Sequence, residues 1–160
     1  MPLAIFDLDN TLLAGDSDYL WGAFLAERGI VDAEAYEHQN ARFYQDYREG
    51  RLDIHAFLRF SLAPLRDNVP SDLQRWRAEF MHEKIEPIIL PAARVLVERH
   101  RGLGDLLLII TATNQFVTAP IAEALGVPHL IATVPRRAGE RYTGEVEGIP
   151  AFRDGKVQRL

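Results

Sequence analysis

Leu3-Ala4-Ile5-Phe6-Asp7-Leu8-Asp9-Asn10-Thr11 is an apolar run that stops abruptly in an acidic stretch. Its first four residues are apolar on both faces, which is typical of a central parallel strand covered by helices on both sides. Two further apolar runs lie at residues 106–110 and 129–133, and a helical pattern over 116–125, ended by Gly126, separates them. This order of strand, helix and strand predicts an α/β protein with a parallel sheet.

The segment between the first two predicted strands contains no convincing strand of its own. Aromatic and leucine residues recur there at helical intervals, and several prolines divide the series. We therefore predict that a helical insertion, residues 16–87, interrupts an α/β core formed by residues 1–15 and 88–160. We interpret this insertion as a lid over the core. Residues 141–146 have the pattern of part of a hairpin or of an excursion of the chain.

Length and composition exclude several classes of protein. The 160 residues are enough for one domain with an insertion, and 48% of them are hydrophobic. The formal net charge of −5 disfavours a broad nucleic-acid-binding surface. The absence of cysteine excludes disulfides, thiolate zinc sites and cysteine nucleophiles. No apolar stretch is long enough to span a membrane and the N-terminus is not a signal peptide, so we expect a cytoplasmic protein without membrane contacts.

Asp7 and Asp9 are the first candidates for chemistry, because they follow a buried strand directly. Side chains at the carboxyl end of a parallel strand reach the crevice where open α/β sheets bind ligands. Two carboxylates in one small space repel each other unless a proton or a cation intervenes, and oxygen ligands favour magnesium. One carboxylate could then attack phosphorus while the other protonates the leaving oxygen. Alternatively, the two aspartates only shape a loop and cap a helix.

Three motifs in the same order resemble those of the haloacid dehalogenase-like (HAD) hydrolase superfamily. Asp7-Leu8-Asp9-Asn10-Thr11 resembles its first motif, DxDx[TV]; Thr111 follows the second predicted strand, where the family carries a phosphate-binding Ser or Thr; and Lys156 resembles the third-motif lysine. The likeness covers essentially the whole chain and is greatest to subclass IB, the phosphoserine-phosphatase-like group. It implies a HAD-like Rossmannoid parallel sheet with a helical C1 cap inserted after strand 1.

The resemblance implies a role for each matching residue. Asp7 would be the nucleophile and a magnesium ligand. Asp9 would be the general acid and then the general base, and its backbone carbonyl would also bind magnesium. Thr111 would donate its hydroxyl, and Ala112 its backbone N–H, to the phosphoryl oxygens. Lys156 would neutralise charge between Asp7 and the phosphoryl group, since phosphoryl transfer depends mainly on positioning and charge neutralisation.

Two further residues are candidates for binding the rest of a small phosphorylated metabolite. The family's phosphoserine phosphatases hold the substrate amino group with an acidic residue shortly after the first motif, and Asp16 lies at about that place. They hold the carboxylate with a cap arginine. That position falls on Ser61 here, and Arg59 lies two residues away. The sequence does not identify the alcohol that the substrate contains.

One family motif has no counterpart in the 160 residues. It is an acidic GDxxxD-type segment that follows a further strand and supplies another magnesium carboxylate, whereas the sequence ends four residues after Lys156. In the usual topology that strand flanks the first one. We therefore expect residues 3–6 to form an exposed apolar edge, which a homo-oligomer or another partner would cover.

The sequence leaves more than one function open. The leading prediction is a magnesium-dependent phosphatase that hydrolyses a small phosphomonoester through an aspartyl-phosphate intermediate. The alternatives are a phosphomutase and a truncated, non-catalytic protein of the same fold that binds a ligand or partner. A dehalogenase fits less well, because halide leaves without a proton and has no need of Asp9.

Overall fold

A four-stranded sheet forms the centre of the protein, described here by a computed structural model of residues 1–160. The strands lie in the order β1-β2-β3-β4, with the first three parallel and β4 antiparallel to β3. This confirms the predicted α/β class, its parallel sheet and the hairpin. The bounds of the strands are β1 Leu3–Phe6, β2 Leu106–Asn114, β3 His129–Ala138 and β4 Arg141–Glu147.

Two of the strands are longer than the apolar runs that predict them. The expectation that the second strand ends at Ile110 is wrong, because β2 continues to Asn114 through an irregularity in its pairing with β3. The third strand continues from Thr133 to Ala138, where it pairs with β4. In both cases backbone hydrogen bonding extends the strand past its hydrophobic segment.

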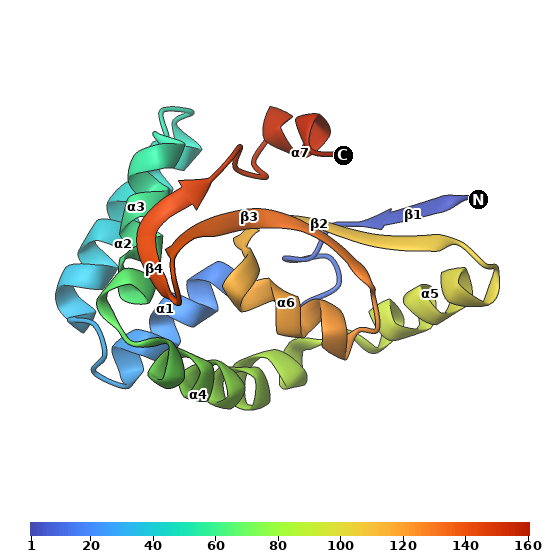
Figure 1. Ribbon diagram of the computed structural model, residues 1–160, viewed down its shortest axis with the longest axis horizontal. Coiled ribbons are helices and arrows are strands. Elements are labelled where there is room, and N and C mark those ends of the chain that lie inside the picture. Colours follow the sequence, from blue (N-terminus) through green and yellow to red (C-terminus); the bar gives the residue numbers. More distant parts are fainter.

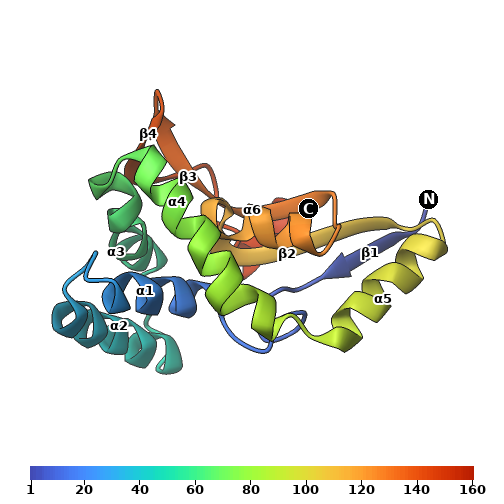
Figure 2. The same ribbon diagram turned by 90° about the horizontal axis from the view of Figure 1, so that it is seen from below.

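Helices occupy the predicted insertion, as expected. Three of its helices begin at aspartates, Asp16, Asp32 and Asp53, whose side chains accept hydrogen bonds from backbone N–H groups of the first turn. The helices between β1 and β2 are α1 Ser17–Glu27, α2 Ala33–Arg48, α3 Ile54–Asp67, α4 Pro70–Phe80, the short η1 Met81–Ile85 and η2 Glu86–Ile88, and α5 Pro91–Gly102. Figure 2 shows α4 running from the side of α3 and the hairpin toward α5.

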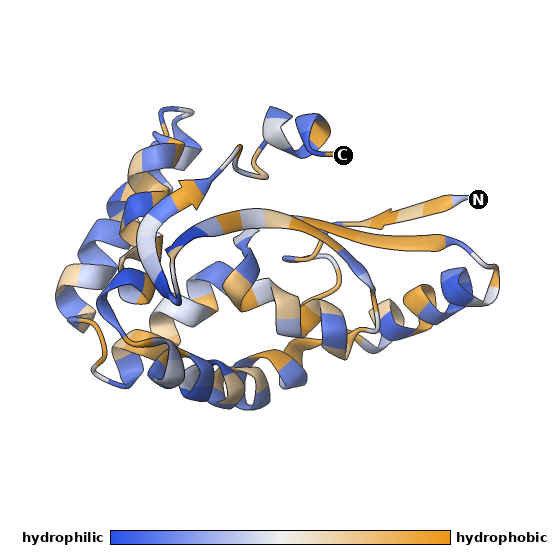
Figure 3. Ribbon diagram, in the orientation of Figure 1, coloured by the Kyte–Doolittle hydropathy of each residue, from blue (hydrophilic) through white to orange (hydrophobic).

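One hydrophobic cluster joins the insertion to the sheet. The most continuously apolar segments are β1 and β2 (Figure 3). Helix α6, Gln115–Ala124, and the short α7, Asp154–Gln158, lie on opposite sides of the sheet (Figure 1). Fully or almost fully buried members of the cluster come from both parts of the chain: Trp21, Phe24, Leu62, Leu73, Phe80, Ile109, Phe116 and Ile121. The division of the chain at residues 16–87 therefore stays a prediction.

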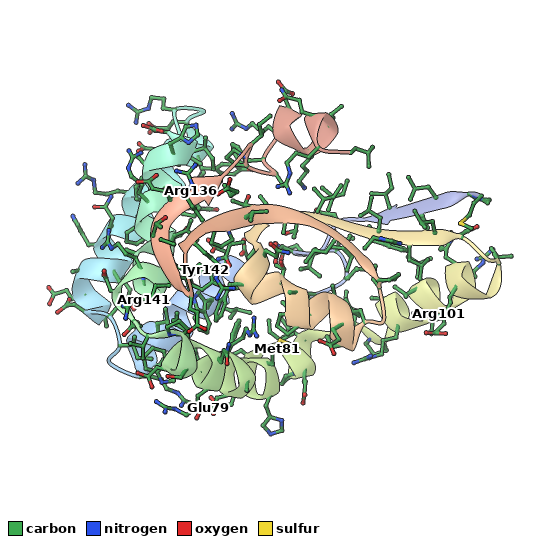
Figure 4. The ribbon with its side chains drawn as sticks, viewed as in Figure 1. Glu79, Met81, Arg101, Arg136, Arg141 and Tyr142 are labelled. Carbon is green, nitrogen blue, oxygen red and sulfur yellow. The ribbon has the colours of Figure 1, made fainter.

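The β3–β4 hairpin reaches the insertion from the other side. Arg141 donates a hydrogen bond to the backbone carbonyl of Arg66 in α3, with 3.4 Å between the two atoms. The Tyr142 ring packs edge-on against Phe116 at the start of α6, with 5.7 Å between ring centres. Figure 4 shows both hairpin side chains, together with Arg136, at the end of the molecule where α3 lies. The hairpin thus contacts both the insertion, at Arg66, and α6 of the core, at Phe116.

Strand β1 lies at one edge of the sheet and pairs only with β2. Side chains on one of its faces remain partly open, since Leu3 is 45% and Ile5 46% exposed, whereas Ala4 and Phe6 are buried. The expected apolar edge is therefore present in these residues.

None of the helices combines the length and apolarity needed to cross a membrane.

Candidate active site

The register of β1 against β2 brings the two predicted motifs together. Phe6, the last residue of β1, is paired with Ile109, so the chain that follows β1 runs beside Thr111. Between the two aspartates, the fully buried Leu8 anchors the loop, and its carbonyl accepts hydrogen bonds from the next backbone turn. Asn10 adopts a positive φ of 57°, which asparagine tolerates better than most residues. The loop therefore holds Asp7 and Asp9 at the carboxyl end of the sheet.

The Asp9 carboxylate accepts four hydrogen bonds. Its Oδ1 accepts from the backbone N–H and the hydroxyl of Ser17, at 2.7 and 2.6 Å. Its Oδ2 accepts from the hydroxyls of Thr111 and Thr113, at 3.1 and 2.8 Å. Ser17, Thr111 and Thr113 are all buried, so this carboxylate is held from two elements, α1 and β2.

Asp7 has a much more open environment. Its side chain is 52% exposed, and its Oδ1 lies 3.3 Å from Nζ of Lys156. The lysine comes from α7, almost at the other end of the sequence. Gly155 makes this approach possible, because a Cβ at that position would lie 2.0 Å from the backbone oxygen of Pro150. A nucleophile needs an accessible oxygen and a nearby cation, and Asp7 has both.

Strand β3 anchors the segment that carries Lys156. The backbone N–H of Ala151 donates to the hydroxyl of the buried Thr133, at 3.1 Å. Arg159 donates to the backbone carbonyl of Ala132. These two bonds hold α7 on the sheet at both ends, so the position of Lys156 is set by β3 rather than by the short helix alone.

Asp16 and its neighbour in α1, Asp18, add negative charge beside the two central aspartates. Asp16 caps α1 by accepting hydrogen bonds from the N–H groups of Asp18 and Tyr19, at 2.9 and 3.1 Å. Desolvation and, secondly, the charge of Asp9 raise the pKa of Asp16. Desolvation, followed by the charges of Asp16 and Asp9, raises the pKa of Asp18 to about 7. No lysine or arginine is among the groups that shift the pKa of Asp16 or Asp18.

Arg59 is not drawn into the cluster. Its side chain projects from α3 into solvent and forms no hydrogen bond or ion pair, whereas Leu58 and Leu62 of the same helix are buried. Ser61, at the position that the family likeness gives to an arginine, is buried and its hydroxyl donates to the carbonyl of Leu58. A binding role for Arg59 stays a prediction.

Sequence reasoning missed Ser17 and Thr113. Thr113 lies two residues after Thr111, and alternate residues of a strand share a face, so a longer second strand would have identified it. Ser17 carries no comparable signal, since it is one hydroxyl residue beside a helix cap. Ala112, between the two threonines, is part-exposed.

Two oxygen atoms of the site are free to bind a cation. Asp7 Oδ2 accepts no hydrogen bond from the protein, and the backbone carbonyl of Asp9 accepts none from the backbone. No group of three or more His, Cys, Asp or Glu side chains is placed to hold a metal ion. One or two protein oxygens, completed by waters and substrate phosphate, form the usual environment of magnesium rather than of calcium or zinc.

Comparison with known proteins identifies the family to which the chain belongs. The sequence model of the haloacid dehalogenase-like hydrolases matches residues 4–160. A histidinol-phosphatase of Neisseria meningitidis serogroup C (strain 8013) is 45% identical over 159 residues, which cover 99% of this chain and 72% of that protein. The phosphoserine phosphatase SerB1 of Mycobacterium tuberculosis is 30% identical over 160 residues, and the chain spans only 52% of its length.

Solved structures show the same architecture. A protein of unknown function from Bordetella pertussis Tohama I superposes with a TM-score of 0.93 at 47% identity, covering 99% of this chain and 71% of that one. A substrate-bound phosphoserine phosphatase has a TM-score of 0.68 at 19% identity, covering 99% of this chain and 68% of that one. The second likeness concerns the fold alone, and it matches the HAD-like Rossmannoid sheet predicted from the sequence.

Proposed function

The chain belongs to the haloacid dehalogenase-like hydrolase family, and from this membership we propose that it is a magnesium-dependent phosphatase that hydrolyses a small phosphomonoester through an aspartyl-phosphate intermediate. One observation carries the proposal. The accessible Asp7 carboxylate lies 3.3 Å from Lys156, while Asp9 beside it is hydrogen-bonded to Thr111. These residues come from three distant segments, and their types are those that phosphoryl transfer requires.

The residues divide the reaction between them. An oxygen of Asp7 attacks phosphorus and the bond from phosphorus to the alcohol oxygen breaks. Asp9 gives its proton to the departing alcohol and afterwards takes one from the water that hydrolyses the aspartyl-phosphate. Lys156 balances the charge between Asp7 and the phosphoryl group. Thr111 and the backbone N–H of Ala112 donate hydrogen bonds to the phosphoryl oxygens.

Asp7 Oδ2 and the carbonyl oxygen of Asp9 would hold magnesium, since both are oxygen atoms without another protein partner at this edge. Bound there, the ion supplies positive charge that offsets the repulsion between Asp7 and the phosphate dianion. Asp9 can serve in both roles because they use different groups: the side-chain carboxyl would move the proton, and the backbone carbonyl, which accepts no backbone hydrogen bond, would bind the ion.

The proposed substrate is the phosphate ester of a small amino alcohol. The names of the two curated relatives indicate substrates of this kind, histidinol phosphate and phosphoserine. Asp16 and Asp18 support the idea, because neither forms an ion pair with a protein cation and both are close enough to Asp9 for its charge to raise their pKa. A cationic amino group there would be attracted to both of them. The cytoplasmic location and the partner at the β1 edge stay predictions.

The test is hydrolysis of 4-nitrophenyl phosphate by the purified chain, with magnesium and with a chelator, beside an Asp7→Asn variant. We expect turnover in magnesium that is lost with the chelator and lost in the variant, whose melting temperature should match that of the wild type. Release of phosphate to water distinguishes a phosphatase from a mutase. A folded chain without turnover would favour the non-catalytic alternative, and an active Asp7→Asn would exclude Asp7 as the nucleophile. The rates of hydrolysis of histidinol phosphate and phosphoserine then show which alcohol the enzyme prefers.

A further inference from the structure

Asp9 lies in a loop, yet its carboxylate accepts four hydrogen bonds from residues of α1 and β2. Two donors of one residue, Ser17, reach Oδ1, and the hydroxyls of Thr111 and Thr113 reach Oδ2. A carboxylate that only shaped its loop would have no need of hydroxyls from a strand more than a hundred positions away. We propose that Thr113 and Ser17 are positioning residues, which hold Asp9 in the orientation from which it passes its proton to the leaving alcohol. This inference rests on the proposed function.

The hydrogen bonds separate the role of Thr113 from that of Thr111. The Thr111 hydroxyl oxygen accepts from the backbone N–H of Thr113, at 3.2 Å, and its single proton points to Asp9. A hydroxyl has only one proton to donate. When Thr111 donates to a phosphoryl oxygen instead, Asp9 Oδ2 loses that partner. Thr113, at 2.8 Å, is then the donor that still holds Oδ2 while the substrate is bound.

Both positioning residues are buried and belong to elements of secondary structure. Thr113 is 6% exposed in β2, and Ser17 is fully buried in the first turn of α1. Threonine is stiff about its first side-chain torsion, so its hydroxyl keeps one direction. Groups that must be placed within a fraction of an ångström depend on such supporting contacts. Asp9 itself follows the end of β1 and has no regular hydrogen-bonding pattern of its own to supply this support.

The role predicts a particular kinetic signature. In the step concerned, the bond from Asp7 to phosphorus forms, the bond from phosphorus to the alcohol oxygen breaks, and the Asp9 proton moves to that oxygen. A strongly basic alkoxide needs this proton, whereas a nitrophenolate leaves without it. Loss of the Asp9 orientation should therefore slow the release of an alkyl alcohol far more than the release of nitrophenol. A general loss of structure would slow both equally.

The experiment compares kcat/KM for benzyl phosphate and for 4-nitrophenyl phosphate, which have similar size and differ in the basicity of the leaving group. The ratio kcat/KM covers the steps up to departure of the alcohol, so the later hydrolysis of the intermediate does not obscure the comparison. For Thr113→Val we expect a loss of about 30-fold with benzyl phosphate and of less than about threefold with 4-nitrophenyl phosphate, within the range of general acid catalysis. Thr113→Ser should restore the benzyl rate to within about threefold, because it keeps the donor.

Two more variants keep the test decisive. Ser17→Ala removes one of the two donors to Oδ1, so it should show the same leaving-group pattern with a loss of about fivefold for benzyl phosphate. Thr118→Val is the matched control, because Thr118 is a buried threonine whose hydroxyl bonds to the Asn114 carbonyl and not to Asp9. It should change the two rates by the same factor. Melting temperatures establish that each variant is folded.

The outcomes separate this inference from the proposed function. If the wild type hydrolyses neither ester, the proposed function fails. If the wild type hydrolyses both and Thr113→Val lowers both rates equally, as Thr118→Val does, the positioning role is overturned and Thr113 is only structural. If Thr113→Val does not fold, the same judgement is made on Ser17→Ala, for which equal losses overturn the proposal and selective losses support it.

Discussion

Two ends of the site differ in how their charges are satisfied. At the phosphoryl end, Asp7 is paired with Lys156, and Asp9 accepts four hydrogen bonds. At the insertion end, the charged groups that act on Asp18 are the carboxylates of Asp16 and Asp9, and the Arg59 side chain is exposed to solvent. The pairing of β1 with β2 positions the residues of the phosphoryl end. The residues of the insertion end lie on helices, which pack through their apolar faces. The phosphoryl end is therefore fixed before a ligand arrives, whereas charges at the insertion end lack protein partners.

The prediction with the largest expected effect on activity concerns the two lysines of the chain. Lys156→Ala should lower kcat/KM by about 10²- to 10³-fold, which is typical of removing one preorganised charge-stabilising group. Lys84→Ala is the matched control, since Lys84 pairs with Glu27 at 3.1 Å on the surface. A surface pair of this kind contributes at most about 1 kcal/mol to stability and has no contact with the site. Initial rates on 4-nitrophenyl phosphate measure both variants.

A loss of less than about threefold in Lys156→Ala would break the comparison, because an ordinary exposed ion pair contributes that little. Lys156 would then be a surface lysine, and the phosphoryl end would have no functional cation of its own. An equal loss in Lys84→Ala would point instead to a general sensitivity of the fold.

The insertion end can be tested through pH. Burial and the neighbouring carboxylates raise the pKa of Asp18 from 3.8 to about 7, so between these values the folded protein binds a proton that the unfolded chain has released. Stability falls with rising pH wherever the unfolded state binds fewer protons. Asp18 should therefore make the free energy of unfolding decline from pH 3.8 toward about 7 and level off above it.

Urea denaturation across this pH range compares the wild type with Asp18→Asn. The variant cannot ionise, so its stability should lack the decline and should exceed that of the wild type most clearly at neutral pH and above. Parallel curves for the two proteins would mean that Asp18 is well solvated, and the contrast between the two ends would disappear.

The two ends also differ in how far the sequence predicts them. Asp7 and Asp9 follow from a local pattern, because an acidic pair directly after an apolar run has few other places to lie in a parallel sheet, whereas Lys156 is predicted only through the family resemblance. Thr113 escapes such reasoning, since the hydrophobic signal of β2 ends at Ile110 and the backbone pairing that extends the strand leaves no pattern in the side chains.

Arg59 illustrates the limit for helices. Periodicity locates α3, but the direction of one polar side chain depends on which apolar residues face the core, and here Leu58, Leu62 and Leu65 do so. Which residues face the core is determined by the elements that pack against α3, among them β4, and not by the helix alone. Asp16 has a similar ambiguity, because an aspartate before a helix is both a cap and a candidate for binding a ligand.

The smallest expected effect is therefore that of Arg59→Ala. An exposed guanidinium without a partner is well hydrated and screened by salt, so its removal should raise KM for histidinol phosphate or phosphoserine by less than about threefold and leave kcat unchanged. Arg42→Ala, an exposed arginine of α2, is the matched control and should behave alike. Steady-state kinetics at low and high ionic strength measure both. A rise in KM of more than about tenfold in Arg59→Ala alone, with kcat intact, would show that Arg59 binds the substrate uniformly in ground and transition states, and the insertion end would then carry a specific anion contact.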